Sequence, residues 1–160
     1  MDMVLQLATA FLGSLGFALL FQVKRERLLL ASLGGLLAWG VYLLMGLVTD
    51  QDVVRYFVAS VILTIYGEML ARVVKCPATL FIVTASIPLI PGGSLYRTMQ
   101  FFMQNDLASF SAQALTTVLL AVSIAVGMLF PTAIFQLHRR VSDRQSAPPP
   151  TTPGAPGVRR

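Results

Sequence analysis

Long apolar stretches alternate with short polar segments over most of the chain. The polar segments lie at 24–27, 49–52, 72–75 and 104–106, and they separate apolar segments at 4–23, 28–48, 53–74, 78–103 and 107–137. An α-helix rises about 1.5 Å per residue, so about 20 apolar residues cross the ~30 Å hydrocarbon core of a bilayer. Each of these apolar segments is therefore long enough to be a membrane-spanning helix.

The composition agrees with a chain that lies mostly in lipid. Hydrophobic residues make up 56% of the sequence and charged residues 12%, whereas a soluble domain carries about 25% charged residues. The mean hydropathy is +0.74. The sequence therefore predicts an all-α, polytopic integral membrane protein. Its transmembrane helical domain covers residues 1–141, with five helices and the fourth broken between Pro88 and Gly93.

The positive charge indicates orientation in the membrane and not a nucleic-acid partner. The net charge of +5 comes from small clusters beside the apolar segments, not from a basic stripe with interleaved aromatic residues. Cytoplasmic loops carry an excess of Lys and Arg. With five spans, only Arg55 and Arg97 fall on one face, and the other basic residues fall on the opposite face. This split predicts a multi-pass protein with its N-terminus outside and its C-terminus in the cytoplasm.

The two ends of the chain differ from the apolar segments. Residues 142–160 are rich in Ser, Pro, Thr and Gly, and such a segment cannot bury enough apolar area to offset its chain entropy. We expect a disordered, Pro-rich cytoplasmic tail. Residues 1–3 lack the basic region of a secretory signal, so we expect the first apolar segment to remain as a span.

Residue sets for catalysis or metal binding are missing from the sequence. One cysteine and one histidine cannot form an internal disulfide or assemble a metal site. The sequence also lacks a nucleophile with a base, a carboxylate pair and a Gly-rich phosphate loop after a strand. We therefore expect no enzyme, no cofactor and no metal.

The strongest local feature is a run of helix-breaking residues inside the fourth apolar segment. Pro88 and Pro91 each remove a backbone donor and clash with the preceding turn. Gly92 and Gly93 allow backbone angles that other residues avoid. Because the freed backbone groups cannot face lipid, a broken span is tolerated only beside protein or a water-filled cavity. The sequence thus predicts a cavity next to this break.

The second half of the broken span is predicted to begin with free amide groups. The N–H groups of Gly93, Ser94 and Leu95 would form its first turn, and the positive end of the helix dipole suits a carboxylate. Two interpretations stay open. One is a substrate site, and the other is a proline kink or surface loop that binds no ligand.

A pair of opposite charges lies in the third apolar segment. Glu68 and Arg72 are four residues apart and share one helical face. An ionisable residue inside a bilayer costs about 2.5–3.5 kcal/mol on insertion scales and is a functional candidate by default. Because the pair lies near the cytoplasmic end, Arg72 can reach the headgroups while it pairs with Glu68. A structural ion pair is the first interpretation, and Glu68 as acceptor of a coupling proton is the alternative.

Three motifs in succession resemble the threonine/serine exporter family. They are Gly-Glu-Met-Leu-Ala-Arg at 67–72, Lys-Cys-Pro-Ala-Thr at 75–79 and Ile-Pro-Leu-Ile-Pro-Gly-Gly-Ser-Leu-Tyr at 87–96. Each motif alone is weak, but their order and spacing make the resemblance specific. Over residues 1–140 the chain looks most like the short-subunit type, which corresponds to the C-terminal half of the fused exporters.

This resemblance implies a bacterial inner-membrane secondary exporter driven by the proton motive force. It also implies a longer membrane subunit as partner and a small anionic or zwitterionic substrate, either threonine or serine or a dicarboxylate such as succinate. Five spans are few for alternating access, which usually opposes two repeats, so a partner or a homo-oligomer is expected. The rival hypothesis is a non-transporting membrane scaffold or assembly protein.

The expected site residues form two groups. The resemblance and the break together assign substrate binding to Pro88, Pro91, Gly92, Gly93, Ser94 and Tyr96, and proton coupling to Glu68 and Arg72.

Overall fold

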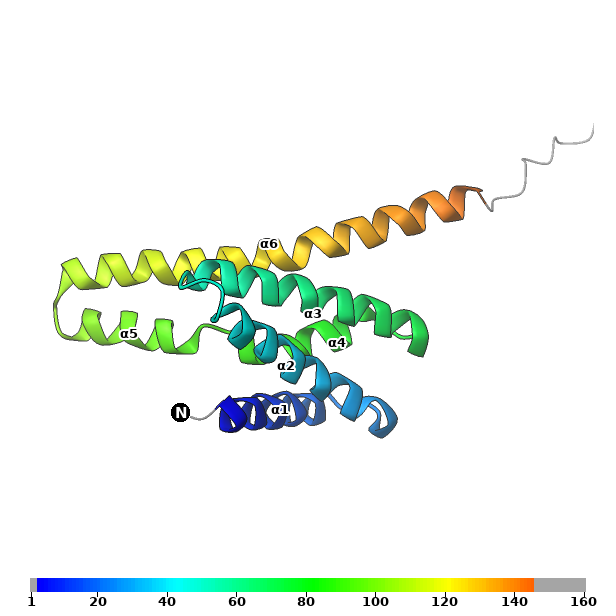
Figure 1. The fold of residues 1–160 in the computed structure, drawn as a ribbon, viewed down its shortest axis with the longest axis horizontal. Helices are drawn as coiled ribbons and strands as arrows, with labels where there is room; N and C mark the ends of the chain where they lie inside the picture. The colour runs from blue at the N-terminus through cyan, green and yellow to red at the C-terminus, as the bar shows by residue number, and fades with distance from the viewer. Residues whose placement is uncertain (1–2, 146–160) are drawn as a thin grey trace, which may run out of the picture.

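The computed structural model describes residues 3–145, and the side chains of residues 3–137 (Figure 1). This part of the chain is all-helical, with 87% of its residues in helices and no strand. The elements in chain order are α1 (Met3–Leu20), α2 (Arg25–Met45), α3 (Asp52–Val74), α4 (Ala78–Ser86), the 3₁₀ helix η1 (Ile87–Leu89), α5 (Gly92–Met103) and α6 (Leu107–Gln145).

The membrane-spanning helices agree with the predicted fold class. Within the described residues, α1, α2, α3 and α6 are each long and apolar enough to cross a membrane, and α4–η1 with α5, a pair bent by 50°, makes up to five if the pair is one span. The predicted broken fourth span is confirmed, because the helix stops between Pro88 and Gly93 as expected. The chain is thus a multi-pass membrane protein.

Three of the turns between the helices are short and contain a left-handed residue, namely α1–α2, α3–α4 and α5–α6. Gln22, Lys75 and Asn105 have φ values of 54°, 52° and 56°, which is the backbone conformation that commonly ends helices. Cys76 donates its N–H to the carbonyl of Ala71 at 3.0 Å and so closes the end of α3. Turns of this kind place consecutive helices side by side in opposite directions.

Small residues allow the helices to approach closely. α2 lies between α1 on one side and α3 and α4 on the other. A Cβ atom on Gly34 would lie 2.7 Å from the Cβ of Ala85, and one on Gly127 would lie 2.9 Å from the carbonyl oxygen of Phe57. Packing of this kind drives helix association in lipid, where apolar burial alone does not.

α5 and the first part of α6 form a helical hairpin that extends beyond the other helices (Figure 1). Asp106 caps α6 by accepting the N–H of Ser109 at 3.1 Å. None of the twelve residues of α5 is buried. The hairpin therefore leaves an apolar face of α5 uncovered within the described part of the chain.

α6 continues past the predicted start of the tail. The composition predicts a tail from residue 142, whereas the helix runs to Gln145. Residues 142–145 contain no proline, and the first proline of the tail is Pro148, so nothing in the sequence stops the helix at 142. The rest of the predicted tail lies outside the described residues.

Candidate functional site

The break in the fourth span leaves part of the backbone without helical partners. Ile90 donates its N–H to the carbonyl of Ile87 at 3.2 Å, and Leu95 donates to Pro91 at 3.0 Å. The prediction of a free amide at Leu95 is therefore wrong, because this group closes the first turn of α5. Gly93 and Ser94 lie in the first turn, where helix geometry provides no intrahelical acceptor.

A polar cavity of about 390 Å³ lies against this break, and we call it the break cavity. The predicted residues Pro91, Gly92, Gly93 and Ser94 all line it. The remaining lining residues come from α2, α3, α5, α6 and the segment before α5, namely Trp39, Asp52, Tyr56, Ile90, Arg97, Gln113, Thr116 and Leu120. The predicted cavity beside the break is thus present.

Hydroxyl and amide groups hold Ser94 at the edge of the break cavity. Ser94 Oγ lies 2.7 Å from Thr117 Oγ1 and accepts the Nε2 amide of Gln113 at 2.9 Å. Thr117 Oγ1 also lies 3.0 Å from Thr98 Oγ1. This network joins α5 to α6. Since α5 has no extensive contact with α2 or α3, its position depends on these bonds and on its packing against α6.

Arg97 is a site residue that the sequence analysis did not identify. It lines the break cavity and also an adjoining cavity of about 720 Å³, which Pro88, Gly93 and Trp39 share. Among the described residues, none of the ion pairs involves Arg97. The sequence contained one indication of this role. Arg97 lies three residues after Ser94, so both are on one face of a helix that starts at the break.

The carboxylate of Asp52 in the break cavity already has partners. Asp52 Oδ1 accepts the hydroxyl of Tyr42 at 3.2 Å and lies 3.3 Å from Arg55 Nη1. Arg55 also donates its Nε to the carbonyl of Thr49 at 2.7 Å. These bonds tie the loop between α2 and α3 to α3, so the guanidinium of Arg97 is the charge that the break cavity offers to a ligand.

Two predicted substrate-binding residues lie away from the break cavity. Tyr96 is 71% exposed on α5, and it lines neither of the two cavities that meet at the break. Pro88 lines only the adjoining cavity. The structure thus gathers the predicted glycines with Pro91 and Ser94, and leaves Tyr96 facing outward.

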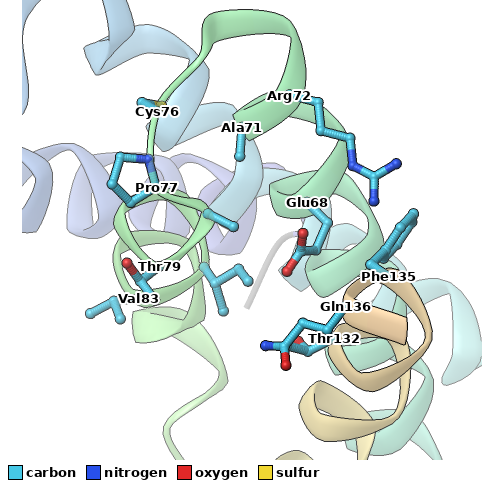
Figure 2. Close-up of a pocket in the computed structure, with 12 residues that line it drawn as sticks. Glu68, Ala71, Arg72, Cys76, Pro77, Thr79, Val83, Thr132, Phe135 and Gln136 are labelled. Carbon is cyan, nitrogen blue, oxygen red and sulfur yellow. The ribbon is translucent and has the colours of Figure 1, made fainter. Parts of the chain in front are cut away.

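Glu68 and Arg72 line a third cavity of about 380 Å³, which we call the Glu68 cavity (Figure 2). The expected ion pair is not formed, since no ion pair joins these two described residues. Instead, the guanidinium carbon of Arg72 lies 4.5 Å from the ring centre of Phe135. Figure 2 shows the Glu68 carboxylate and the Gln136 amide pointing into the space between α4 and α6.

The break cavity and the Glu68 cavity lie at opposite ends of α3. Tyr56 lines the break cavity and Glu68 lines the Glu68 cavity. These two residues are about 18 Å apart along the helix axis, at 1.5 Å per residue. Between them, Leu63, Thr64 and Leu89 are completely buried. Beside this buried core, a further cavity of about 200 Å³ shares Ile90 and Pro91 with the break cavity and continues along α6 toward the Glu68 cavity, where Ala121, Ile124 and Met128 line it. In the described part of the chain, no cluster of His, Cys, Asp or Glu could hold a metal ion.

The comparison with known families decides the assignment of the chain. Residues 6–134 match the family described as "Threonine/Serine exporter, ThrE". The chain belongs to the threonine/serine exporter family. The matched range includes the whole break cavity and all of the Glu68 cavity except Phe135 and Gln136. No curated protein and no solved structure matches the chain.

Proposed function

We propose that this chain is a subunit of a secondary exporter for small carboxylate-bearing metabolites in a bacterial inner membrane. The substrates would be threonine and serine, or a dicarboxylate such as succinate. The observation that carries the proposal is the break cavity, where Arg97 and the first turn of α5 lie beside a broken span. Membership of the exporter family supports the transport of threonine- or serine-type substrates.

The break cavity is suited to a carboxylate for two reasons. A guanidinium group can donate two parallel hydrogen bonds to a carboxylate, and Arg97 has no competing ion pair among the described residues. The free amides at Gly93 and Ser94 add the positive end of the α5 dipole. Gln113 and Thr116 of α6 add uncharged polar side chains to the lining of the same cavity.

The coupling ion of the proposed exporter is a proton, and its acceptor is Glu68. This carboxylate lies in a membrane-spanning helix and makes no ion pair with Arg72, although both residues line the same cavity. An unpaired carboxylate in such a position costs free energy and is by default a functional candidate. With the C-terminus in the cytoplasm, the Glu68 cavity lies toward the cytoplasm and the break cavity toward the outside.

A longer membrane subunit of the same exporter, or a second copy of this chain, completes the proposed transport path. The break cavity and the Glu68 cavity share no lining residue, and we expect helices to move when substrate passes from one to the other. Alternating access of this kind usually requires two opposed repeats, and the described part of the chain supplies at most five spans. The uncovered apolar face of α5 is consistent with a partner on that side.

Efflux of labelled threonine, serine and succinate from cells tests the proposal. A Cβ atom at Gly92 would meet nothing within 4 Å, so Gly92→Leu should fold and fill the break cavity. We expect Arg97→Gln to reduce efflux by about tenfold, the value for one lost charged hydrogen bond. Gly92→Leu should reduce efflux because its side chain occupies the space that the substrate needs. Gly16→Leu, at an exposed glycine of α1 with the same open space, is the matched control.

The same experiment separates the exporter from the scaffold hypothesis. If Gly92→Leu and Arg97→Gln export each substrate at the unchanged rate in a well-expressed protein, the break cavity is not the substrate site. The scaffold hypothesis predicts two results together. Both variants leave efflux intact, and deletion of the chain prevents assembly of the membrane complex.

A further inference from the structure

The Glu68 cavity holds two opposite charges that do not neutralise each other. Glu68 is half-buried, and its carboxylate points into the space between α4 and α6 (Figure 2). The guanidinium of Arg72 is held over the ring of Phe135, 4.5 Å from the ring centre. Stacking on an aromatic face leaves the N–H donors at the edge of a guanidinium free. The cavity thus presents one acceptor site for a cation and one donor site for an anion.

The size and lining of the Glu68 cavity fit a small polar molecule. Its volume is about 380 Å³, at the lower end of the ~300–1,000 Å³ range of small-molecule sites. Gln136 and Thr132 on α6 add neutral polar groups next to the charges, and Ile82 and Val83 on α4 form an apolar wall. With Thr79 of α4, a ligand here meets two charges, three uncharged polar side chains and a hydrophobic surface.

We propose that the Glu68 cavity binds an α-amino acid as a zwitterion, with its ammonium group on Glu68 and its carboxylate on Arg72. The inference rests on the proposed export function and narrows its substrate class at this second site. A dicarboxylate such as succinate would place one negative group against Glu68, and like charges at such a distance repel. The cavity therefore selects amino acids over dicarboxylates.

Binding of an ammonium group at Glu68 would also provide the proton coupling that is proposed above. A protonated carboxyl makes no ionic contact with an ammonium group, so proton entry releases the zwitterion. Of the other residues that line this cavity, only Arg72 and Cys76 are charged or titratable. Neither the residues of α4 nor the α6 stretch 132–137 contains an ionisable side chain. Glu68 thus holds either a proton or the substrate, as an exchanger requires.

Cys76 provides a direct test, because it lines the Glu68 cavity and is the single cysteine of the chain. The rate of Cys76 alkylation by N-ethylmaleimide is measured on the full chain in membranes. We expect threonine to slow the reaction. N-acetylthreonine lacks the ammonium charge, threonine methyl ester lacks the carboxylate, and succinate carries two negative groups, so none of these should protect.

Two variants assign the roles of the charges. Glu68→Gln and Arg72→Gln should each raise the threonine concentration needed for protection by about tenfold, as for one lost charged hydrogen bond. Glu26→Gln and Arg25→Gln change exposed residues of the first turn of α2, and they are the matched controls with unchanged protection. Equilibrium binding of labelled threonine to the purified chain gives a second measurement that does not depend on the cysteine.

The outcomes separate this site from the proposed export function. Absence of protection by threonine, equal protection by succinate, or full threonine binding by Glu68→Gln would each overturn the zwitterion site. Protection of Cys76 by threonine in a chain whose deletion leaves cellular efflux unchanged would support the site and refute the export proposal. Loss of efflux in Gly92→Leu with no threonine binding at the Glu68 cavity would do the reverse.

Discussion

The guanidinium of Arg72 lies 4.5 Å from the ring centre of Phe135, and not against the carboxylate of Glu68 one helical turn away. α6 thus supplies the partner that keeps the two charges of the Glu68 cavity apart. A cation over an aromatic face contributes about 0.5–1 kcal/mol at exposed sites. The contact between Arg72 and Phe135 is therefore weak enough that a bound ligand or a substitution can move the guanidinium to another partner.

Phe135→Leu should allow Arg72 to pair with Glu68. Leu retains most of the apolar volume but has no π face for the cation, so we expect a change in stability of about 0.5–1 kcal/mol. Threonine efflux should fall several-fold, because Glu68 becomes neutralised. Efflux at equal protein level is the measurement, and Phe130→Leu, an exposed position on the same helix, is the control. Efflux at the normal rate in Phe135→Leu would contradict this role of the ring.

Thr117→Val should loosen the hairpin of α5 and α6. The substitution keeps the shape of the side chain but removes the hydroxyl that contacts Ser94 at 2.7 Å and Thr98 at 3.0 Å. We expect a loss of about 0.5–1.5 kcal/mol in the free energy of unfolding, the net value of a hydrogen bond, because Ser94 keeps its bond from Gln113 and Thr98 keeps its bond to the carbonyl of Ser94. Thermal unfolding in detergent measures the loss. Thr116→Val removes a hydroxyl that bonds only within α6, to Ala112, and should change stability less.

Gly127→Val should separate α3 from α6. A Cβ atom at Gly127 would lie 2.9 Å from the carbonyl oxygen of Phe57, which is backbone and cannot turn away, and it would also meet the hydroxyl of Ser60. Overpacking of a close interface costs about 1–3 kcal/mol. We expect a lower unfolding temperature for Gly127→Val than for Gly16→Val, where the added atoms meet open space. Equal unfolding temperatures would show that this helix contact is adaptable.

Asp106 should make the start of α6 sensitive to acid. Hydrogen bonds from Ser109 hold the pKa of Asp106 below its ordinary value. Since the folded-state pKa is lowered, the stabilisation is present above the unfolded-state pKa of about 3.9. It is lost as the pH falls through the folded-state value. Asp106→Asn keeps a capping oxygen without a titrating group, so its unfolding temperature should vary less than that of wild type between neutral and acidic pH.

Much of the fold follows from the sequence because each part of it is local. A run of about 20 apolar residues must be helical in lipid to satisfy its own backbone, and this gave the position of every span within a few residues. Pro88 and Pro91 likewise predict a break, because proline lacks a backbone N–H and interrupts the helix whatever its neighbours in the fold are. Only the end of α6, at Gln145 and not at 141, lay beyond the predicted domain boundary.

The sites divide in the same way between local and tertiary causes. The sequence by itself determined the membrane fold, the break and the glycines that open it, because these depend on backbone chemistry. Only the tertiary structure decided that Arg97 joins the break cavity, that Tyr96 faces outward, and that Arg72 binds Phe135. These contacts join residues from helices far apart in the sequence. Side-chain partners across such distances depend on helix packing, which no local pattern encodes.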